Sequence, residues 1–108
     1  GDLPEMKSAM AVELGKGPAV KVMDRSVICT PAVVDALEQA AKDCGVSAQR
    51  EILLCGGTDT SALQKARAGV QAGAVSIPTR YIHSPSELCA VSDVEDAAKL
   101  LAQYALRK

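Results

Sequence analysis

The clearest pattern of apolar and polar positions in the chain predicts a helix that begins at Pro31 and ends before Gly45. Apolar residues recur at steps of three and four positions, which places them on one helical face; they are Val33, Val34, Leu37, Ala40, Ala41 and Cys44. Thr30 suits the N-cap, and Pro31 suits the first helical position, where a missing N–H group loses no hydrogen bond. Gly45 can adopt the left-handed conformation that ends a helix.

A second helical pattern occupies the end of the chain. Ser92 and Glu95 have the spacing of a capping box, in which the two side chains bond backbone N–H groups at the start of the helix. The stripe expected to be buried consists of Val94, Ala97, Ala98, Leu101 and Ala105. A shorter helix is predicted over 62–68, with Gly69 ending it.

Apolar runs between the helices predict strands over 19–23, 50–54 and 74–77, and we expect the last two to be buried. A further short strand is indicated near 88–91. Because strands and helices alternate with short links, we expect right-handed crossovers and a mostly parallel sheet. The predicted fold class is α/β, a three-layer arrangement of a mostly parallel sheet with flanking helices, and residues 1–108 form a single domain.

Composition and charge exclude several classes of function. The 108 residues carry 12 Lys or Arg against 13 Asp or Glu, a net charge of −1, whereas charge-driven nucleic-acid binding needs clustered cations. No apolar run approaches the roughly 20 residues that span a bilayer. We therefore expect a cytoplasmic protein with neither a membrane nor a nucleic acid as partner. The four cysteines form no C-x-x-C pair, and we expect them to be reduced and packed as small apolar groups.

Two polar loops follow predicted strands, and in an open parallel sheet a site forms beyond the carboxyl ends of the strands. We therefore expect both loops at one edge of the sheet. The first loop, 56–61, reads GGTDTS. Its paired glycines let the backbone approach a ligand, and its amides precede a helix N-terminus, which favours anions. Spacing alone favours the alternative, a tight turn in which Asp59 or Ser61 caps the helix.

The second loop, 79–87, reads TRYIHSPSE and holds the only histidine of the chain. It gathers a cation, a phenol, an imidazole, a hydroxyl and a carboxylate: Arg80, Tyr81, His83, Ser84 and Glu87. His83 is a candidate metal ligand or general base. A lone histidine is more often a structural hydrogen-bonding residue, so spacing leaves both interpretations open.

These loops resemble the carboxyl-terminal signature of a known family. The segment 56–59 (GGTD), then Gly69-Val70, then 76–85 (SIPTRYIHSP) are similar to that signature in the M42 family of two-metal aminopeptidases, some of which are labelled endoglucanases. Flanking segments fit as well: Gly1-Asp2-x-Pro4, Leu14-Gly15-Lys16-Gly17-Pro18, Gln49 and Asp93-x-Glu95. The resemblance covers essentially the whole chain and implies a fragment of a phosphorylase/hydrolase-like peptidase fold.

The resemblance also implies roles for individual residues. His83 would ligate one of two divalent metal ions, zinc or cobalt, and imidazole suits both. Substrate would lie against Gly57, Thr58, Asp59 and Arg80. The family's other ligands and its general base lie toward the amino terminus of family members, and Asp2 does not match a ligand. This chain is therefore expected to hold one of five metal ligands and no catalytic residue.

Three hypotheses of function follow. The leading one is the carboxyl-terminal fragment of an aminopeptidase catalytic domain. The fragment alone would be inactive and would act on peptides only with the missing amino-terminal part as its partner. It would also form homo-oligomers through an exposed apolar surface. The second is a non-catalytic binding or assembly module of the same fold, a closed monomer with His83 hydrogen-bonded inside it. The third is glycoside hydrolysis, which needs two placed carboxylates; Asp59 and Glu87 are the acids near both loops.

Overall fold

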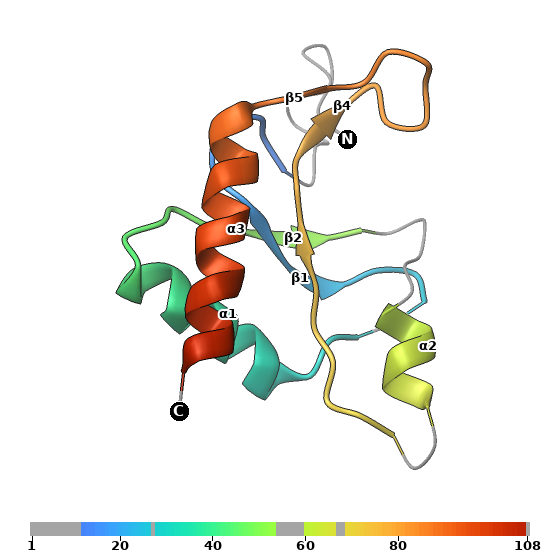
Figure 1. Ribbon diagram of the computed structural model, residues 1–108. Coiled ribbons are helices and arrows are strands. Elements are labelled where there is room, and N and C mark those ends of the chain that lie inside the picture. The colour runs from blue at the N-terminus through green and yellow to red at the C-terminus, as the bar shows by residue number, and fades with distance from the viewer. Residues whose placement is uncertain (1–11, 27, 54–59, 67–68, 108) are drawn as a thin grey trace.

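Helices and short strands alternate along the chain in the computed structural model (Figure 1). It describes residues 12–26, 28–53, 60–66 and 69–107. The elements, in chain order, are β1 (Ala19–Met23), α1 (Pro31–Asp43), β2 (Gln49–Ile52), α2 (Thr60–Lys65), β3 (Val75–Ser76), β4 (Thr79–Arg80), β5 (Leu88–Cys89) and α3 (Val91–Leu106). The predicted α/β class is confirmed.

Two small sheets organise the strands. The first has the order β2-β1-β3, and β4 pairs with β5 in the second. β1 and β2 run parallel, as predicted, with Ala19 opposite Gln49. β3 runs antiparallel to β1, with Val20 opposite Val75, so the expectation of a mostly parallel sheet holds for the β1–β2 pair and is wrong for β3.

The connections from β1 to β2 and from β2 to β3 contain helices of different length. The 13 residues of α1 rise about 20 Å, enough to carry the chain back along the sheet for a parallel crossover. The six residues of α2 rise only about 9 Å. The chain enters β3 from the end of the sheet at which it left β2, because β3 pairs antiparallel with β1.

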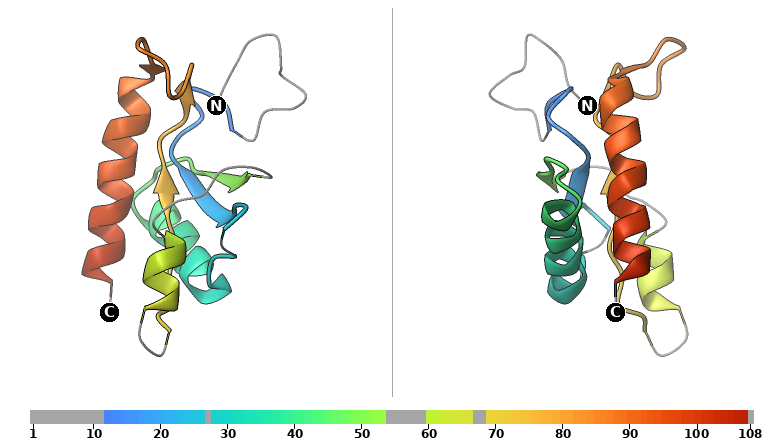
Figure 2. Two further views of the ribbon diagram at one scale, coloured as in Figure 1. Left: turned by 90° about the vertical axis from the view of Figure 1, so that its right-hand side faces the viewer. Right: turned by 60° about the vertical axis from the view of Figure 1, so that its left-hand side comes forward.

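The core lies between the central strand and two helices that lie side by side (Figure 2). It is built from β1, α1, α3 and the segment before α1; its buried members are Val20, Cys29, Val33, Val34, Leu37, Ala41 and Leu100. Small and branched side chains allow α1 and α3 to approach each other and the sheet closely. None of the helices formed by the described residues is both long and apolar enough to cross a bilayer.

Helix α1 follows its sequence pattern. It begins at Pro31, and five of the six predicted stripe residues are buried while Cys44 is half-buried. Gly45 has φ of 72°, which is the left-handed stop expected of it. Thr30 is the N-cap residue, as predicted, but its side chain makes no capping hydrogen bond. Its Oγ1 instead accepts a hydrogen bond from the Ala72 amide (3.0 Å), and so ties the start of α1 to the segment that leads into β3.

Two predicted burial patterns are wrong. In β2 the buried side chain is Glu51, whereas Ile52 is 50% exposed, because Glu51 lies opposite buried Lys21 in the strand register. In α3 the buried face consists of Asp93, Ala97 and Leu100. Of the predicted stripe only Ala97 is buried.

The capping box at the start of α3 is also wrong. Ala90 is the N-cap residue and the helix starts at Val91, so Ser92 already lies within the first turn. The inward-facing acid of this turn is Asp93, which is 1% exposed. Asp93 binds a loop from the other end of the chain, and this contact sets which face of α3 turns toward the core.

Candidate functional site

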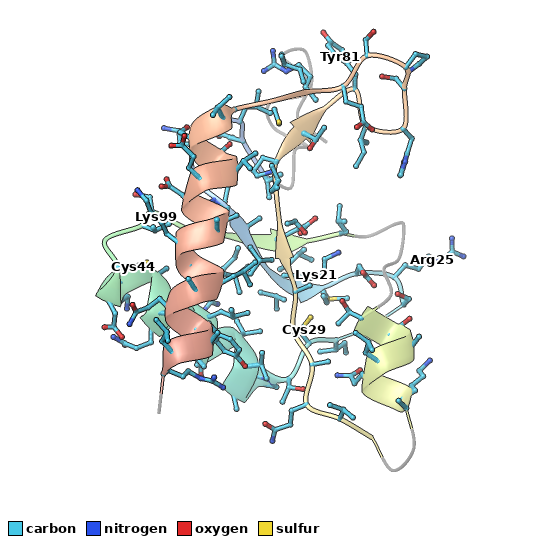
Figure 3. The ribbon with its side chains drawn as sticks, in the orientation of Figure 1. Lys21, Arg25, Cys29, Cys44, Tyr81 and Lys99 are labelled. Atoms are coloured by element: carbon cyan, nitrogen blue, oxygen red, sulfur yellow. The ribbon has the colours of Figure 1, made fainter. Side chains whose placement is uncertain are left out.

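The β4–β5 hairpin presents the residues of the second polar loop. β4 and β5 pair antiparallel, with Thr79 opposite Cys89 and Arg80 opposite Leu88, which leaves 81–87 as the connecting loop. Every residue of this loop is exposed, His83 included. Figure 3 places Tyr81 at the top of the hairpin, away from Lys21 and Cys29. His83 is therefore displayed at the surface and is not packed in the core.

The loop has an unusual backbone. Tyr81 has φ of 58° and His83 has φ of 61°, in the left-handed region that residues other than glycine seldom adopt. The Ser84 amide and hydroxyl both donate to the carbonyl oxygen of Tyr81. The His83 amide donates to Oε1 of Glu87 at 2.6 Å. The loop is thus closed by its own polar groups.

A buried carboxylate connects the base of this hairpin to the beginning of the described chain. Asp93 Oδ2 accepts from the Gly15 amide (2.8 Å), and Oδ1 accepts from the Gly17 amide (2.9 Å). From the other side, Gln49 Nε2 donates to the carbonyl oxygens of Gly17 (2.8 Å) and Glu13 (2.9 Å). The loop before β1 is therefore held between α3 and β2, and α3 directly follows the hairpin that carries His83.

Gly15, Gly17, Gln49 and Asp93 belong to segments that resemble the family, but the sequence indicates no contact between them. A Gly-x-Gly pair followed by a distant Asp in the first turn of a helix carries no local signal that the two bind each other. The sequence pattern instead predicts a capping box of Ser92 and Glu95 at this helix start. Only the fold reveals that Asp93 accepts hydrogen bonds from backbone amides 76 and 78 positions earlier in the chain.

Strands β2 and β3 do not end at the same edge of the sheet. Because β3 is antiparallel to β1 and β2, the carboxyl end of β3 lies at the opposite edge from that of β2, and α2 and the hairpin lie at opposite ends of the molecule in Figures 1 and 2. The expectation that both loops lie at one edge of the sheet is therefore not met by the ends of these two strands, and residues 56–59 of the first loop lie outside the described residues. Arg80 is half-buried in β4, whereas Gly57, Thr58 and Asp59 lie outside the described residues.

A second group of charged residues is buried beside β1. Lys21 Nζ lies 3.1 Å from Oδ2 of Asp24, and both residues are nearly inaccessible. Burial alone would raise the pKa of Asp24, but hydrogen bonds from the Ser26 hydroxyl and amide and from Lys21, with the charge of Lys21, hold this pKa well below its ordinary value. Glu51 is also buried, and its Oε2 has no hydrogen-bond partner among the described residues.

The cysteines of the described chain fit the expected reduced state. Cys29, Cys44 and Cys89 are free, and Cys55 lies outside the described residues. Burial raises the pKa of the Cys29 thiol, an effect that nearby Lys21 opposes. A raised pKa keeps the thiol protonated, and a protonated buried thiol is a poor nucleophile. Cys29 is therefore a packing residue.

An apolar groove of about 390 Å³ runs between the helices. Its walls include Leu37 of α1, Leu63 of α2, Val70 and, from α3, Leu101 and Tyr104. Charged side chains are missing from the lining that the described residues provide. The groove therefore suits packing against another apolar surface and not hydrolytic chemistry.

The described residues do not by themselves form a metal centre. Within these parts of the chain, no three His, Cys, Asp or Glu side chains are grouped so that they could hold a metal ion. His83 has an imidazole suited to zinc or cobalt, but a catalytic zinc takes about three protein ligands. His83 can contribute one ligand to a site whose remaining donors come from elsewhere.

Comparison with known proteins matches the sequence of this chain to one family. Residues 1–100 match the family described as M42 glutamyl aminopeptidase. A candidate aminopeptidase of Acetivibrio thermocellus is 48% identical over 103 residues, which are 95% of this chain and 31% of that protein.

Solved structures share the fold. A TET aminopeptidase from the marine sediment archaeon Thaumarchaeota archaeon SCGC AB-539-E09 gives a TM-score of 0.90 at 33% identity, over 95% of this chain and 29% of that one. The Pyrococcus horikoshii TET1 peptidase, which can assemble into a tetrahedron or a large octahedral shell, gives 0.81 at 32% identity, over 90% and 28%. An endoglucanase from Thermotoga maritima gives 0.68 at 29% identity, over 95% and 29%. This chain thus spans less than a third of each of these proteins.

Proposed function

The chain belongs to the M42 peptidase family, and from that premise we propose that it forms the carboxyl-terminal portion of the catalytic domain of a metal-dependent aminopeptidase. Such an enzyme hydrolyses the amino-terminal residue from peptides. The observation that carries the proposal is the exposed hairpin loop 81–87, which presents His83 on a backbone held by Glu87. An imidazole displayed in this way is available to a ligand, as a metal-binding role requires.

His83 is the metal ligand of this proposal. It would bind one of two divalent ions, zinc or cobalt, and such ions polarise a scissile carbonyl and activate water. One imidazole cannot hold a catalytic metal pair. We therefore expect the 108-residue polypeptide alone to release no amino-terminal residues, since it holds neither a full ligand set nor a general base among its described residues.

Substrate recognition is assigned to the two polar loops. Arg80 lies at the base of the His83 loop, and its guanidinium would bind the peptide substrate, together with Gly57, Thr58 and Asp59. The cation of Arg80 suits a carbonyl or carboxylate oxygen of the peptide. An Arg80→Lys variant would retain the charge but lose the planar fork of donors.

The partners in this proposal are the amino-terminal part of a catalytic domain and further copies of the protein, in the cytoplasm. Exposed apolar side chains that line one groove support a surface that another polypeptide covers: Leu63 is 63% exposed, Val70 55% and Leu101 49%. A domain that closes on itself would bury more of this area. This pattern favours the enzyme fragment over the self-contained binding module.

Glycoside hydrolysis finds less support, although one similar structure is named an endoglucanase. That chemistry needs two carboxylates facing a sugar. The Glu87 carboxylate instead accepts a hydrogen bond from the His83 amide, and Asp59 lies outside the described residues. The structure offers no paired acids at the hairpin loop.

Two measurements on one sample test the proposal. Native and denaturing mass spectrometry would reveal whether a larger companion chain stays bound to the 11.2 kDa polypeptide. Release of the first residue from a short peptide, with added Co²⁺ or Zn²⁺, would then be compared between the protein and its His83→Ala variant. We expect no turnover by the 108-residue chain alone. Turnover by that chain which His83→Ala abolishes would overturn the fragment proposal.

A further inference from the structure

The His83 loop holds two residues in a conformation that must be stabilised by its surroundings. Left-handed backbone at a residue other than glycine costs on the order of 1–3 kcal/mol, and both Tyr81 and His83 adopt it. The loop is exposed, so core packing does not supply the compensation. It must come from hydrogen bonds within the hairpin.

Glu87 supplies the most direct of these bonds. Its Oε1 accepts a hydrogen bond from the His83 amide at 2.6 Å, and hydrogen bonds from an amide to a carboxylate are among the stronger ones in proteins. Glu87 is also well anchored, because the next residue, Leu88, pairs with Arg80 across the hairpin. The carboxylate therefore reaches His83 from a fixed point of the backbone.

Ser84 completes the closure from the other side. Its amide and hydroxyl both donate to the Tyr81 carbonyl oxygen, which fixes the peptide that precedes Ile82. His83 thus lies between two anchored positions. Of the two contacts, only the one from Glu87 acts on His83 itself, and Glu87 is the one acidic residue of 81–87.

We propose that Glu87 is a positioning residue for His83: its carboxylate holds the His83 amide, maintains the left-handed backbone and so fixes the direction in which the imidazole is presented. The functional meaning of this role rests on the proposed metal-binding function of His83. The contact itself does not, since it is made within the hairpin. Glu87 then contributes through geometry, and its own oxygens are not required as metal ligands.

The experiment measures His83 by NMR in the full chain. Hydrogen exchange reports whether its amide is hydrogen-bonded, and Hα–Hβ couplings report whether its side chain keeps one rotamer. In the wild-type protein we expect a protected amide and one dominant rotamer. Glu87→Ala should speed amide exchange roughly tenfold or more, as expected on losing a bond to a charged acceptor, and should average the rotamers.

Glu87→Gln separates the acceptor from the charge, because its amide oxygen can still accept the hydrogen bond. It should stay within about threefold of the wild-type exchange rate. Glu95→Ala, which removes an exposed carboxylate on α3, is the matched control and should leave His83 unchanged. If Glu87→Ala fails to fold, Glu87→Met repeats the comparison with a side chain of similar length.

An unprotected His83 amide in the wild-type protein would overturn the inference, as would equal protection in wild type and Glu87→Ala. These outcomes are independent of metal and of turnover. If the exchange pattern is as expected while His83→Ala leaves the aminopeptidase activity of an assembled complex intact, the positioning contact stands and the proposed ligand role fails. The two ideas are therefore separable by experiment.

Discussion

The amide of Gly17 donates a hydrogen bond of 2.9 Å to Oδ1 of Asp93, a residue 76 positions later in the chain. The second oxygen of the same carboxylate accepts the Gly15 amide. One buried side chain thus joins the loop before β1 to the start of α3, and α3 follows directly on the hairpin that presents His83. The position of the candidate ligand relative to the sheet depends on this contact.

Removal of the Asp93 carboxylate should therefore destabilise the protein. Asp93→Ala leaves two backbone N–H groups without their acceptor, and we expect a loss of about 2–4 kcal/mol in the free energy of unfolding. Chemical denaturation monitored by circular dichroism measures it. Asp96→Ala is the control, because Asp96 lies in the same helix and its pair with Lys99 is long, at 4.0 Å; it should cost less than about 1 kcal/mol. Equal stability of the two variants would contradict the assignment.

Gly17 and Gly15 offer a matched pair for the same loop. Both have positive φ, 96° and 78°, but a Cβ at Gly17 would lie 1.8 Å from the Ser47 carbonyl oxygen, whereas a Cβ at Gly15 would meet nothing within 4 Å. Gly15→Ala should cost only the left-handed penalty of about 1–2 kcal/mol. Gly17→Ala should cost clearly more in the same denaturation experiment. A Gly17→Ala variant as stable as Gly15→Ala would show that the loop can move away from Ser47.

The buried Lys21–Asp24 pair predicts a pH dependence of stability. The pKa of Asp24 lies well below its ordinary value of 3.8, because bonds from Ser26 and Lys21 outweigh the opposing effect of burial. The folded state therefore binds fewer protons than the unfolded state. The resulting contribution of Asp24 to the free energy of unfolding is complete above about pH 5 and is lost as the pH falls toward the folded-state pKa. Unfolding curves between pH 7 and pH 2 should show the loss.

Asp24→Asn tests that assignment. It leaves the buried Lys21 charge without its partner and should lower stability at pH 7 by about 3 kcal/mol or more. The variant should also lose much of the decline between pH 5 and pH 2, whereas Asp35→Asn, at an exposed position of α1, should retain it. A decline of the same size in Asp24→Asn would mean that other carboxylates carry the pH dependence.

The free cysteines should react in the order of their exposure. Cys89 is exposed, Cys44 is half-buried and Cys29 is buried, and burial raises the pKa of Cys29. Since the thiolate is the reactive form, iodoacetamide at neutral pH should label Cys89 first and Cys29 last. Peptide mapping by mass spectrometry reads each site separately. Labelling of Cys29 as fast as Cys89 in the folded protein would contradict its place in the core.

Local patterns allowed much of this fold to be predicted from sequence. The bounds of β1 and the start of α1 at Pro31 follow from short-range signals that act within a few residues, and Gly45 ends α1 in the conformation that glycine permits. The family resemblance is likewise confirmed, because it rests on contiguous motifs in the loops. Both kinds of signal lie within short contiguous segments of the sequence.

The features that the sequence did not predict correctly share a different cause. The direction of β3 depends on its pairing with β1, the burial of Glu51 depends on its register with Lys21, and the inward face of α3 depends on amides near the other end of the chain. The contact of Glu87 with His83 depends on closure of the hairpin. Each requires two segments to meet, and the periodicity of one segment cannot report it.

Adjacent leucines in α3 provide the sharpest test of which face is buried. Leu100 is fully buried, whereas Leu101 is 49% exposed and lines the apolar groove. The sequence pattern predicts the reverse, with Leu101 in the buried stripe. Leu100→Ala should cost about 2–5 kcal/mol in the free energy of unfolding, and Leu101→Ala less than about 1 kcal/mol. If another polypeptide covers the groove, Leu101→Glu should also reduce self-association in sedimentation velocity while leaving the fold intact. Equal destabilisation by the two alanine variants would mean that α3 turns a different face to the core.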